Sequence, residues 1–142
     1  MTAVCHSLAQ QLITDAEGAS HDIEITTVNA ATERQAEDVS RSVARSNLFK
    51  AAIYGNDPNW GRVLSAVGTT DAAFDPDRLD VAINGVVVCR NGMIGDPREG
   101  VDLAADRRVT VLVDLKAGDA DATVWTNDLT HDYVEENSAY SS

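Results

Sequence analysis

Residues 81–89 have the sequence VAINGVVVC, in which two short apolar segments flank Asn84-Gly85. An Asn-Gly pair in this setting is the strongest short-range signal for a β-hairpin, because both residues tolerate the positive φ of its two-residue turn. The stretch therefore predicts two antiparallel strands, Val81–Ile83 and Val86–Cys89. We expect the sheet of this protein to contain at least one antiparallel pair.

Other stretches of the chain also have the patterns of strands. In His21–Val28, Ile23 and Ile25 fall on one face and Glu24 and Thr26 on the other. Valines alternate with other residues through 108–115, which is typical of a half-buried strand. Residues 122–126 form another such segment, and the short apolar run 49–54 is predicted to be a buried strand.

Four segments have helical signals. Thr32 and Gln35 form a capping box, in which the Thr32 hydroxyl accepts from the Gln35 amide and the Gln35 side chain bonds back to residue 32. Asp57-Pro58 is a favourable helix start, and Gly68 follows the expected end of that helix. Asp128 is placed to cap a final helix. We expect helices over residues 3–16, 32–46, 57–67 and 129–137.

These elements predict an α/β fold: a layered mixed sheet with helices, including an antiparallel hairpin. The length of 142 residues suits one domain, which we place at 1–142. The order of the elements lacks the regular strand–helix alternation of a doubly wound nucleotide-binding domain. The glycine-containing stretch 55–62 also lacks the lysine of a phosphate-binding loop.

Composition excludes several classes of partner. With 23 acidic and 11 basic residues the net charge is -12, so we expect no nucleic-acid partner. No apolar run is long enough to span a membrane, and we expect no secretory signal. The three histidines are scattered, and Cys5 and Cys89 fit no zinc spacing, so we expect no metal. A cytoplasmic enzyme, or part of one, with free thiols is the economical interpretation.

Three sets of residues, in this order, resemble the ornithine acetyltransferase family, the bifunctional glutamate N-acetyltransferases of arginine biosynthesis. The resemblance covers essentially the whole chain, and the eight-residue block GNDPNWGR is its most specific part. The matching stretches are DAEGA (15–19), SNLFK (46–50) with GNDPNWGR (55–62), and DLT (128–130) with YV (133–134) and NSAY (137–140).

The resemblance implies a part of a larger N-terminal-nucleophile acetyltransferase fold. In the family a precursor cleaves itself before a threonine, which becomes the nucleophile of the second (β) chain. This sequence resembles only the later part of that chain, so it contains no catalytic residue. The implied partners are N-acetylornithine, ornithine and glutamate, the upstream α chain and the N-terminal part of the β chain, within an oligomer. No cofactor is implied, and use of acetyl-coenzyme A stays open.

The resemblance implies that Glu17, Asn137 and Ser142 bind substrate. Glu17 lies in the last turn of the first predicted helix, where the helix dipole disfavours a carboxylate unless a cation such as an ornithine ammonium compensates. The amide of Asn137 can donate to a carboxylate and accept from an amine, which suits an amino acid. In the family the C-terminal tail, with a terminal hydroxyl residue matching Ser142, folds over the substrate.

Other residues invite functional interpretations that we do not adopt. Trp60 and Arg62 belong to a block that we interpret as structural, with Trp60 in an apolar stripe and Arg62 paired to an acidic neighbour. Removal of Met1 would expose Thr2, but Thr2 opens a helix and has no assignable oxyanion donors. The chain departs from the family at Ser20-His21, where Thr-Lys is common, and at Asn127, where Cys is common.

Three interpretations therefore stay open. The first is a piece of an acetyltransferase β chain that is active only together with the upstream parts. The second is a non-catalytic amino-acid-binding module derived from the family. The third is an inactive truncated fragment, which would fold poorly because its missing partner leaves apolar surface exposed.

Overall fold

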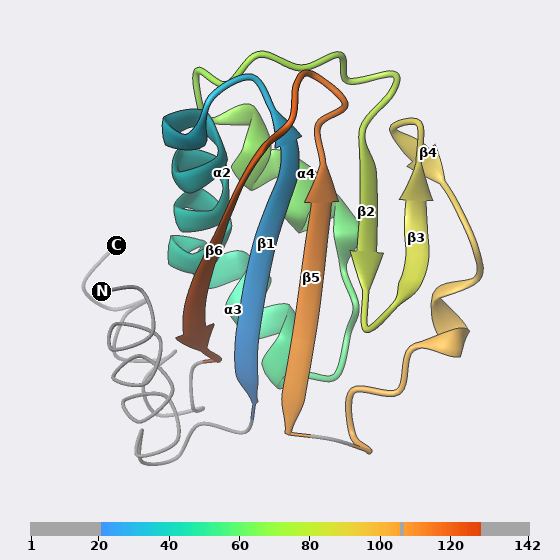
Figure 1. Ribbon diagram of the computed structural model, residues 1–142. Helices are drawn as coiled ribbons and strands as arrows, with labels where there is room; N and C mark the ends of the chain where they lie inside the picture. Colours follow the sequence, from blue (N-terminus) through green and yellow to red (C-terminus); the bar gives the residue numbers. More distant parts are fainter. Residues whose placement is uncertain (1–20, 106, 129–142) are drawn as a thin grey trace.

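The computed structural model describes residues 21–105 and 107–128, which form a layered α/β fold (Figure 1). In chain order, the elements are β1 (Asp22–Ala30), α2 (Glu33–Arg45), α3 (Asn47–Tyr54), α4 (Trp60–Gly68), β2 (Asp80–Ile83), β3 (Val86–Arg90), β4 (Met93–Ile94), the short 3-10 helix η1 (Arg98–Gly100), β5 (Arg108–Asp114) and β6 (Ala120–Asn127). The predicted helices 3–16 and 129–137 lie outside the described residues.

The strands form one mixed sheet in the order β4-β3-β2-β5-β1-β6. Strands β1 and β5 are parallel, with Ile23 opposite Val109, and the other neighbours are antiparallel. The predicted hairpin is confirmed as β2 and β3. Asn84 and Gly85 form its turn with φ of 51° and 83°, the left-handed region that this pair tolerates.

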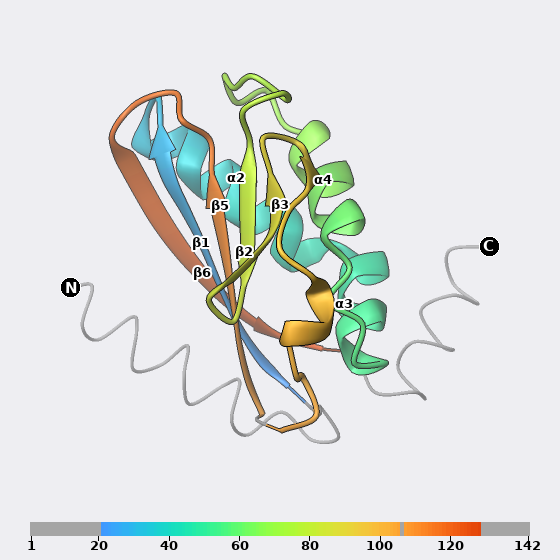
Figure 2. The same ribbon diagram turned by 90° about the vertical axis from the view of Figure 1, so that its right-hand side faces the viewer.

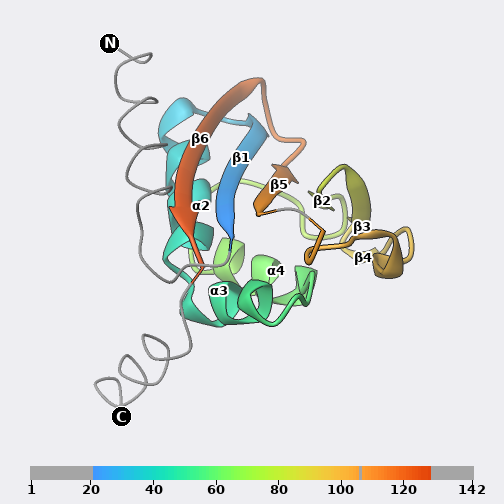
Figure 3. The same cartoon turned by 90° about the horizontal axis from the view of Figure 1, so that it is seen from below.

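Helices α2, α3 and α4 all cover the same face of the sheet (Figures 2 and 3). Strand β1 alternates buried and half-buried residues as predicted, with Ile23 and Ile25 at 1% and 0% exposure. These side chains join Val39 and Val43 of α2 and Val63 of α4 in one apolar core. Burial of branched side chains between the helices and the sheet is the main stabilising contribution here.

One of the two hydrogen bonds of the predicted capping box at α2 is confirmed. The Thr32 hydroxyl accepts from the backbone amide of Gln35 at 3.1 Å. The Gln35 side chain instead accepts from the amide of Ala73, at 2.9 Å, in the loop that follows α4. The polar group expected to close the local cap therefore holds a distant loop against the start of α2.

The prediction of a buried strand over 49–54 was wrong, because this stretch is helix α3. Its helical start comes from Ser46, whose hydroxyl accepts from the amide of Phe49 at 3.1 Å. Phe49 and Ile53, one helical turn apart, are both fully buried. An apolar run of this length fits either element by periodicity, and the cap at Ser46 is the signal that favours the helix.

The predicted start of α4 was also wrong by about two residues. Asn59 caps this helix, since its side-chain oxygen accepts from the amide of Arg62 at 3.1 Å. The Asp57 carboxylate instead accepts from the Asn59 side chain at 3.2 Å. Gly68, expected just beyond the helix, is its last residue. The Asp57 carboxylate and the Asn59 amide side chain thus organise the turn that leads into α4.

Candidate functional site at the ends of strands β1 and β6

The residues implied to bind substrate, Glu17, Asn137 and Ser142, lie outside the described residues, as does Thr2. The described chain begins at His21, four residues after Glu17, and its last described residue is Asp128, nine residues before Asn137. The geometry at these two residues is therefore the part of the structure that bears on the expected site.

His21 and Asp128 contact each other at the adjoining ends of β1 and β6. The two strands are antiparallel with Asp22 opposite Asn127, so the next pair outward is His21 and Asp128. The backbone amide of His21 donates to Asp128 Oδ1 at 2.7 Å, and the amide of Asp128 donates to the His21 carbonyl at 3.2 Å. The two ends of the described chain, residues 21 and 128, are therefore hydrogen-bonded neighbours.

The side chains of this pair are also joined, in a buried position. His21 Nδ1 lies 2.8 Å from Asp128 Oδ2, and the two residues are only 4% and 1% exposed. On the other side of the ring, Nε2 lies 2.7 Å from the carbonyl oxygen of Leu103. A carboxylate and a carbonyl only accept, so all of these bonds are made when both ring nitrogens carry a proton. In that state the pair is a buried ion pair.

Sequence reasoning missed this pair. It treated His21 as one of three scattered histidines and Asp128 as a helix cap, and residues 107 positions apart carry no local signal of pairing. The predicted final helix lies outside the described residues. The structure shows that Asp128 accepts two hydrogen bonds from His21.

Polar side chains on the other face of the sheet form a second cluster next to this pair. Glu24 Oε1 accepts from Trp125 Nε1 at 3.2 Å and lies 3.5 Å from Arg108. Arg107 Nε donates to Asp22 Oδ2 at 3.0 Å, whereas Asp22 Oδ1 is buried and has no hydrogen-bond partner within residues 21–105 and 107–128. These contacts tie β1 to β6 and to the start of β5. They reinforce the end of the sheet at which His21 and Asp128 meet.

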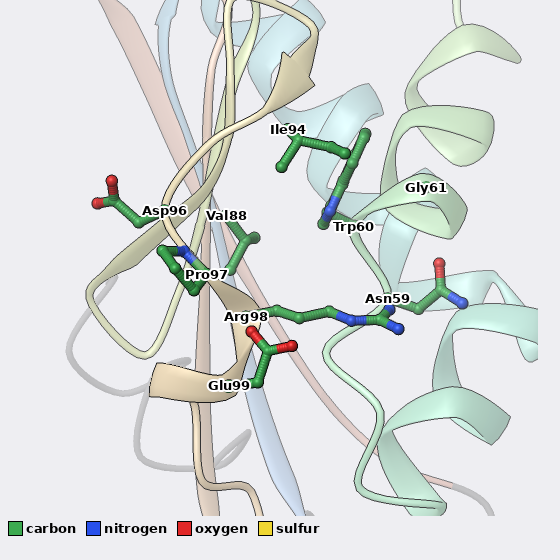
Figure 4. A pocket seen from close by; sticks show the side chains of 9 residues that line it. All are labelled: Asn59, Trp60, Gly61, Val88, Ile94, Asp96, Pro97, Arg98 and Glu99. Carbon is green, nitrogen blue, oxygen red and sulfur yellow. The ribbon is translucent and has the colours of Figure 1, made fainter.

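A separate cavity of about 430 Å³ lies between α4 and the strap that runs from β4 to η1 (Figure 4). Its walls include Trp60 and Ile94, whose side chains lie beside each other, and Val88 of β3. Arg98 and Glu99 contribute charges. None of the nine described residues that line it is a serine, threonine, cysteine, histidine or lysine, so this cavity lacks a nucleophile or base of those types.

The block GNDPNWGR has structural contacts in the folded chain. Val63 and Val67 are fully buried, and Trp60 packs partly buried against the core, so the predicted apolar stripe is confirmed. Among the described residues, Arg62 does not have the acidic partner that we expected. Its guanidinium donates to the carbonyl oxygen of Leu48 at 2.7 Å, which ties the start of α4 to the start of α3.

Lys50 and Cys89 are the residues of nucleophilic type with shifted pKa values in the described part of the chain. Burial lowers the pKa of the half-buried Lys50. Burial raises the pKa of the Cys89 thiol, which is free and fully buried in β3. Within residues 21–105 and 107–128, no cluster of three metal-ligating side chains is present, and no helix has the length and apolarity to cross a membrane.

Known proteins resemble this chain along nearly its whole length. An "Arginine biosynthesis bifunctional protein ArgJ" of Streptomyces coelicolor is 68% identical over 139 residues, which are 98% of this chain and 36% of that protein. The protein of that name from Thermobifida fusca is 62% identical over 142 residues, or 100% of this chain and 37% of that protein. This chain thus spans about a third of the length of these relatives.

A solved structure agrees with the fold described above. The crystal structure of the arginine biosynthesis bifunctional protein argJ from Bacillus halodurans matches with a TM-score of 0.85 and 33% identity, covering 97% of this chain and 66% of that chain. A sequence model of the ArgJ family matches residues 1–142. The match of the complete chain, the identity of its relatives and the shared fold agree: the chain belongs to the ArgJ family.

Proposed function

We propose that this chain is the C-terminal portion of the β chain of an acetyltransferase that moves an acetyl group from N-acetylornithine to glutamate in arginine biosynthesis. Membership of the ArgJ family supports this proposal, as do relatives named as bifunctional proteins of arginine biosynthesis. We place the complete enzyme in the cytoplasm. The reaction needs no cofactor in this proposal.

In this proposal the chain supplies part of the substrate site and not the nucleophile. A threonine at the start of the complete β chain attacks the acetyl group, and its own α-amine can act as the base. Donors in the upstream part stabilise the oxyanion. Glu17 pairs with the ammonium of ornithine, and Asn137 and Ser142 supply polar contacts to the amino acid. The isolated chain is then inactive.

The observation that carries the proposal is the pairing of His21 with Asp128. Four residues of extended chain span at most about 14 Å, which is the upper limit that covalent geometry sets on the distance between Glu17 and His21. Asn137 and Ser142 belong to the segment that leaves the sheet at Asp128, whose backbone bonds directly to His21. Two segments that are distant in sequence are therefore attached to neighbouring residues of the fold, as a substrate site shared between them requires.

The lengths of the matched proteins support a protein made of two chains. The 138 residues that are 97% of this chain make up 66% of the solved chain, which therefore has about 210 residues. The 139 matched residues are 36% of the Streptomyces coelicolor protein, which therefore has about 386. A solved chain of about half that length is the size expected of a cleaved β chain. The remaining partners in the proposal are an upstream α chain, the rest of the β chain and further copies in an oligomer.

An acetyl-transfer assay on two proteins tests the proposal. The complete protein, with its upstream parts, is incubated with N-acetylornithine and glutamate, and ornithine release is measured beside the isolated 142-residue chain. We expect ornithine release by the complete protein and none by the isolated chain. Absence of release from the complete protein, with ornithine still bound, would favour the amino-acid-binding module. Release by the isolated chain that Thr2→Ala abolishes would place the nucleophile at Thr2 and contradict the proposal.

A further inference from the structure

The cavity between α4 and the strap that runs from β4 to η1 has an exposed apolar side chain in its wall. This side chain is Ile94, which is 80% exposed, the largest fraction among the large apolar side chains of the described residues. Met93, the neighbour of Ile94 in β4, is 72% exposed but does not line the cavity. Exposed apolar surface beside a hollow of about 430 Å³ is typical of a binding surface.

The backbone of the strap fixes the position of Ile94. The amides of Gly95 and Asp96 donate to the carbonyl oxygens of Val88 and Val87, at 2.9 and 2.8 Å. A Cβ at position 95 would clash with the Val87 carbonyl oxygen, so the strap needs glycine to approach β3 this closely. The side chain of Val88, which is 1% exposed, belongs to the same cavity. The exposed position of Ile94 therefore belongs to a defined shape of the strap.

The facing wall of the cavity supplies a hydrogen-bond donor. Trp60 is partly buried against the core, and Figure 4 shows its indole ring beside Ile94. Its Nε1 donates to no other described residue, whereas Trp125 Nε1 donates to Glu24. An indole N–H in a partly buried place usually has an acceptor. The cavity therefore suits an occupant that brings both apolar surface and an oxygen acceptor.

The charges around the cavity leave one carboxylate over. Arg98 of the strap pairs with Asp57 at 3.4 Å, and Asp96 pairs with Arg90 at 3.3 Å. Glu99, which also lines the cavity, forms no ion pair within the described part of the chain. Complementary charge on a partner favours the correct contact over wrong ones. An occupant with a basic side chain beside its apolar part matches this arrangement.

A segment of polypeptide has all of these features: apolar side chains, main-chain carbonyl oxygens and a basic side chain. Such segments are plentiful in the complete protein, because this chain spans only 36% and 37% of two of its relatives. A second copy of this chain is the less suitable occupant, since each copy carries a net charge of -12 and the two would repel. The observations therefore favour the upstream parts as the source of the occupant.

We propose that the cavity between Trp60 and Ile94 is a docking surface for a segment of the upstream part of the complete protein. An apolar side chain of that segment fills the space between these two residues. A main-chain carbonyl oxygen accepts from Trp60 Nε1, and a basic side chain lies opposite Glu99. The inference rests on one part of the proposed function, namely that this chain works together with an upstream α chain and the N-terminal part of the β chain.

Photo-crosslinking in the complete protein tests the identity of the occupant. The photoreactive residue p-benzoylphenylalanine replaces Ile94, the protein is irradiated, and the crosslinked peptides are identified by mass spectrometry. We expect crosslinks to residues of the α chain or of the N-terminal part of the β chain. The same residue at position 93 is the matched control, because neighbouring strand residues point to opposite faces, and should give less than about a tenth of that yield.

A charge at the same position tests whether Ile94 is covered. If residue 94 were exposed in the complete protein, Ile94→Asp would change its stability little. Under the docking segment this substitution places a carboxylate against apolar groups. We expect Ile94→Asp to lower the melting temperature of the complete protein by about 5 °C or more and the control Met93→Asp to lower it by less than about 2 °C.

Each other outcome contradicts a stated part of the account. Crosslinks confined to residues 1–142, of the same or a second copy, would overturn the proposal, as would reaction at position 94 with solvent alone. Equal losses in Ile94→Asp and Met93→Asp would overturn it too. If Ile94→Asp does not fold, the crosslink decides. A complete protein that shows the upstream crosslink but no acetyl transfer would contradict the proposed reaction and support the docking surface.

Discussion

The guanidinium of Arg62 donates a hydrogen bond to the main-chain oxygen of Leu48 at 2.7 Å. Arg62 belongs to the block GNDPNWGR. Leu48 lies in the first turn of α3, and the Leu48 side chain is 67% exposed. The bond joins two short helices that follow each other with a turn between them. An arginine that looks like an anion-binding residue in the sequence is thus used to fix the packing of α3 against α4.

We expect Arg62→Met to destabilise the protein by about 1 kcal/mol, because it removes one hydrogen bond from a charged donor and keeps the apolar stem. Urea unfolding measures this change in the free energy of unfolding. Arg34→Met, in an exposed position of α2, is the control and should change it by less than about 0.5 kcal/mol. Loss of substrate binding in Arg62→Met without loss of stability would contradict the structural role.

Acid should weaken the fold through Asp80. Burial opposes ionisation of this carboxyl, but the Asn91 amide at 2.8 Å and the Lys116 ammonium at 3.1 Å outweigh burial and lower its pKa. In the unfolded chain an aspartate carboxyl titrates at about pH 3.9. The stabilisation is therefore present above that pH and is lost as the pH falls through the lower pKa that Asp80 has in the folded protein.

Asp80→Asn should therefore cost about 1 kcal/mol of stability at pH 7, and the difference from the wild type should shrink in strong acid. Urea unfolding at a series of pH values measures it. Asp71→Asn, at an exposed position, serves as the control and should show no such trend. A difference between Asp80→Asn and wild type that stays constant down to the lowest pH would be incompatible with this account.

The Cys89 thiol should be unreactive in the folded protein. It is fully buried in β3, and burial raises its pKa, so little thiolate is available or accessible. In a Cys5→Ser background, we expect reaction with a disulfide reagent to be at least about a hundredfold slower than in guanidinium chloride. Equal rates in the two conditions would show that β3 is not packed as described.

Alanine should have opposite effects at two glycines. A Cβ added at Gly118 would lie 2.4 Å from the Ala30 carbonyl oxygen, in the connection between β5 and β6, so backbone would have to move. At Gly68, the last residue of α4, a Cβ would meet nothing within 4 Å. We expect Gly118→Ala to cost about 2 kcal/mol or more and Gly68→Ala to contribute up to about 1 kcal/mol, measured as changes in melting temperature. A stabilising Gly118→Ala would refute the described approach of these backbones.

The sequence predicted those elements whose signals are local. The alternation of β5 and the Asn84-Gly85 turn each follow from neighbouring residues, and both are confirmed. Helix α3 differs from the prediction because a short apolar run fits two kinds of element, and the Ser46 cap is the local feature that favours the helix. The start of α4 was misplaced because Asp57-Pro58 is as good a start signal as the Asn59 cap that the fold uses.

The pairing of His21 with Asp128 could not be predicted in this way. It depends on the register of β6 against β1, which is set by strand alternation and packing along the whole sheet. The roles expected of Glu17 and Asn137, by contrast, come from the resemblance to the family. The structure contributes the point of the fold from which their two segments start.

The central claim is that Glu17 belongs to the substrate site of the complete enzyme, and steady-state kinetics of Glu17→Ala tests it most directly. We predict a loss in kcat/KM for N-acetylornithine of about 1–3 kcal/mol, or about 5- to 150-fold, because the ligand ammonium loses its carboxylate partner. Glu33→Ala, at an exposed position in the first turn of α2, is the control and should leave these kinetics unchanged. A Glu17→Ala enzyme with wild-type kcat/KM would contradict the account.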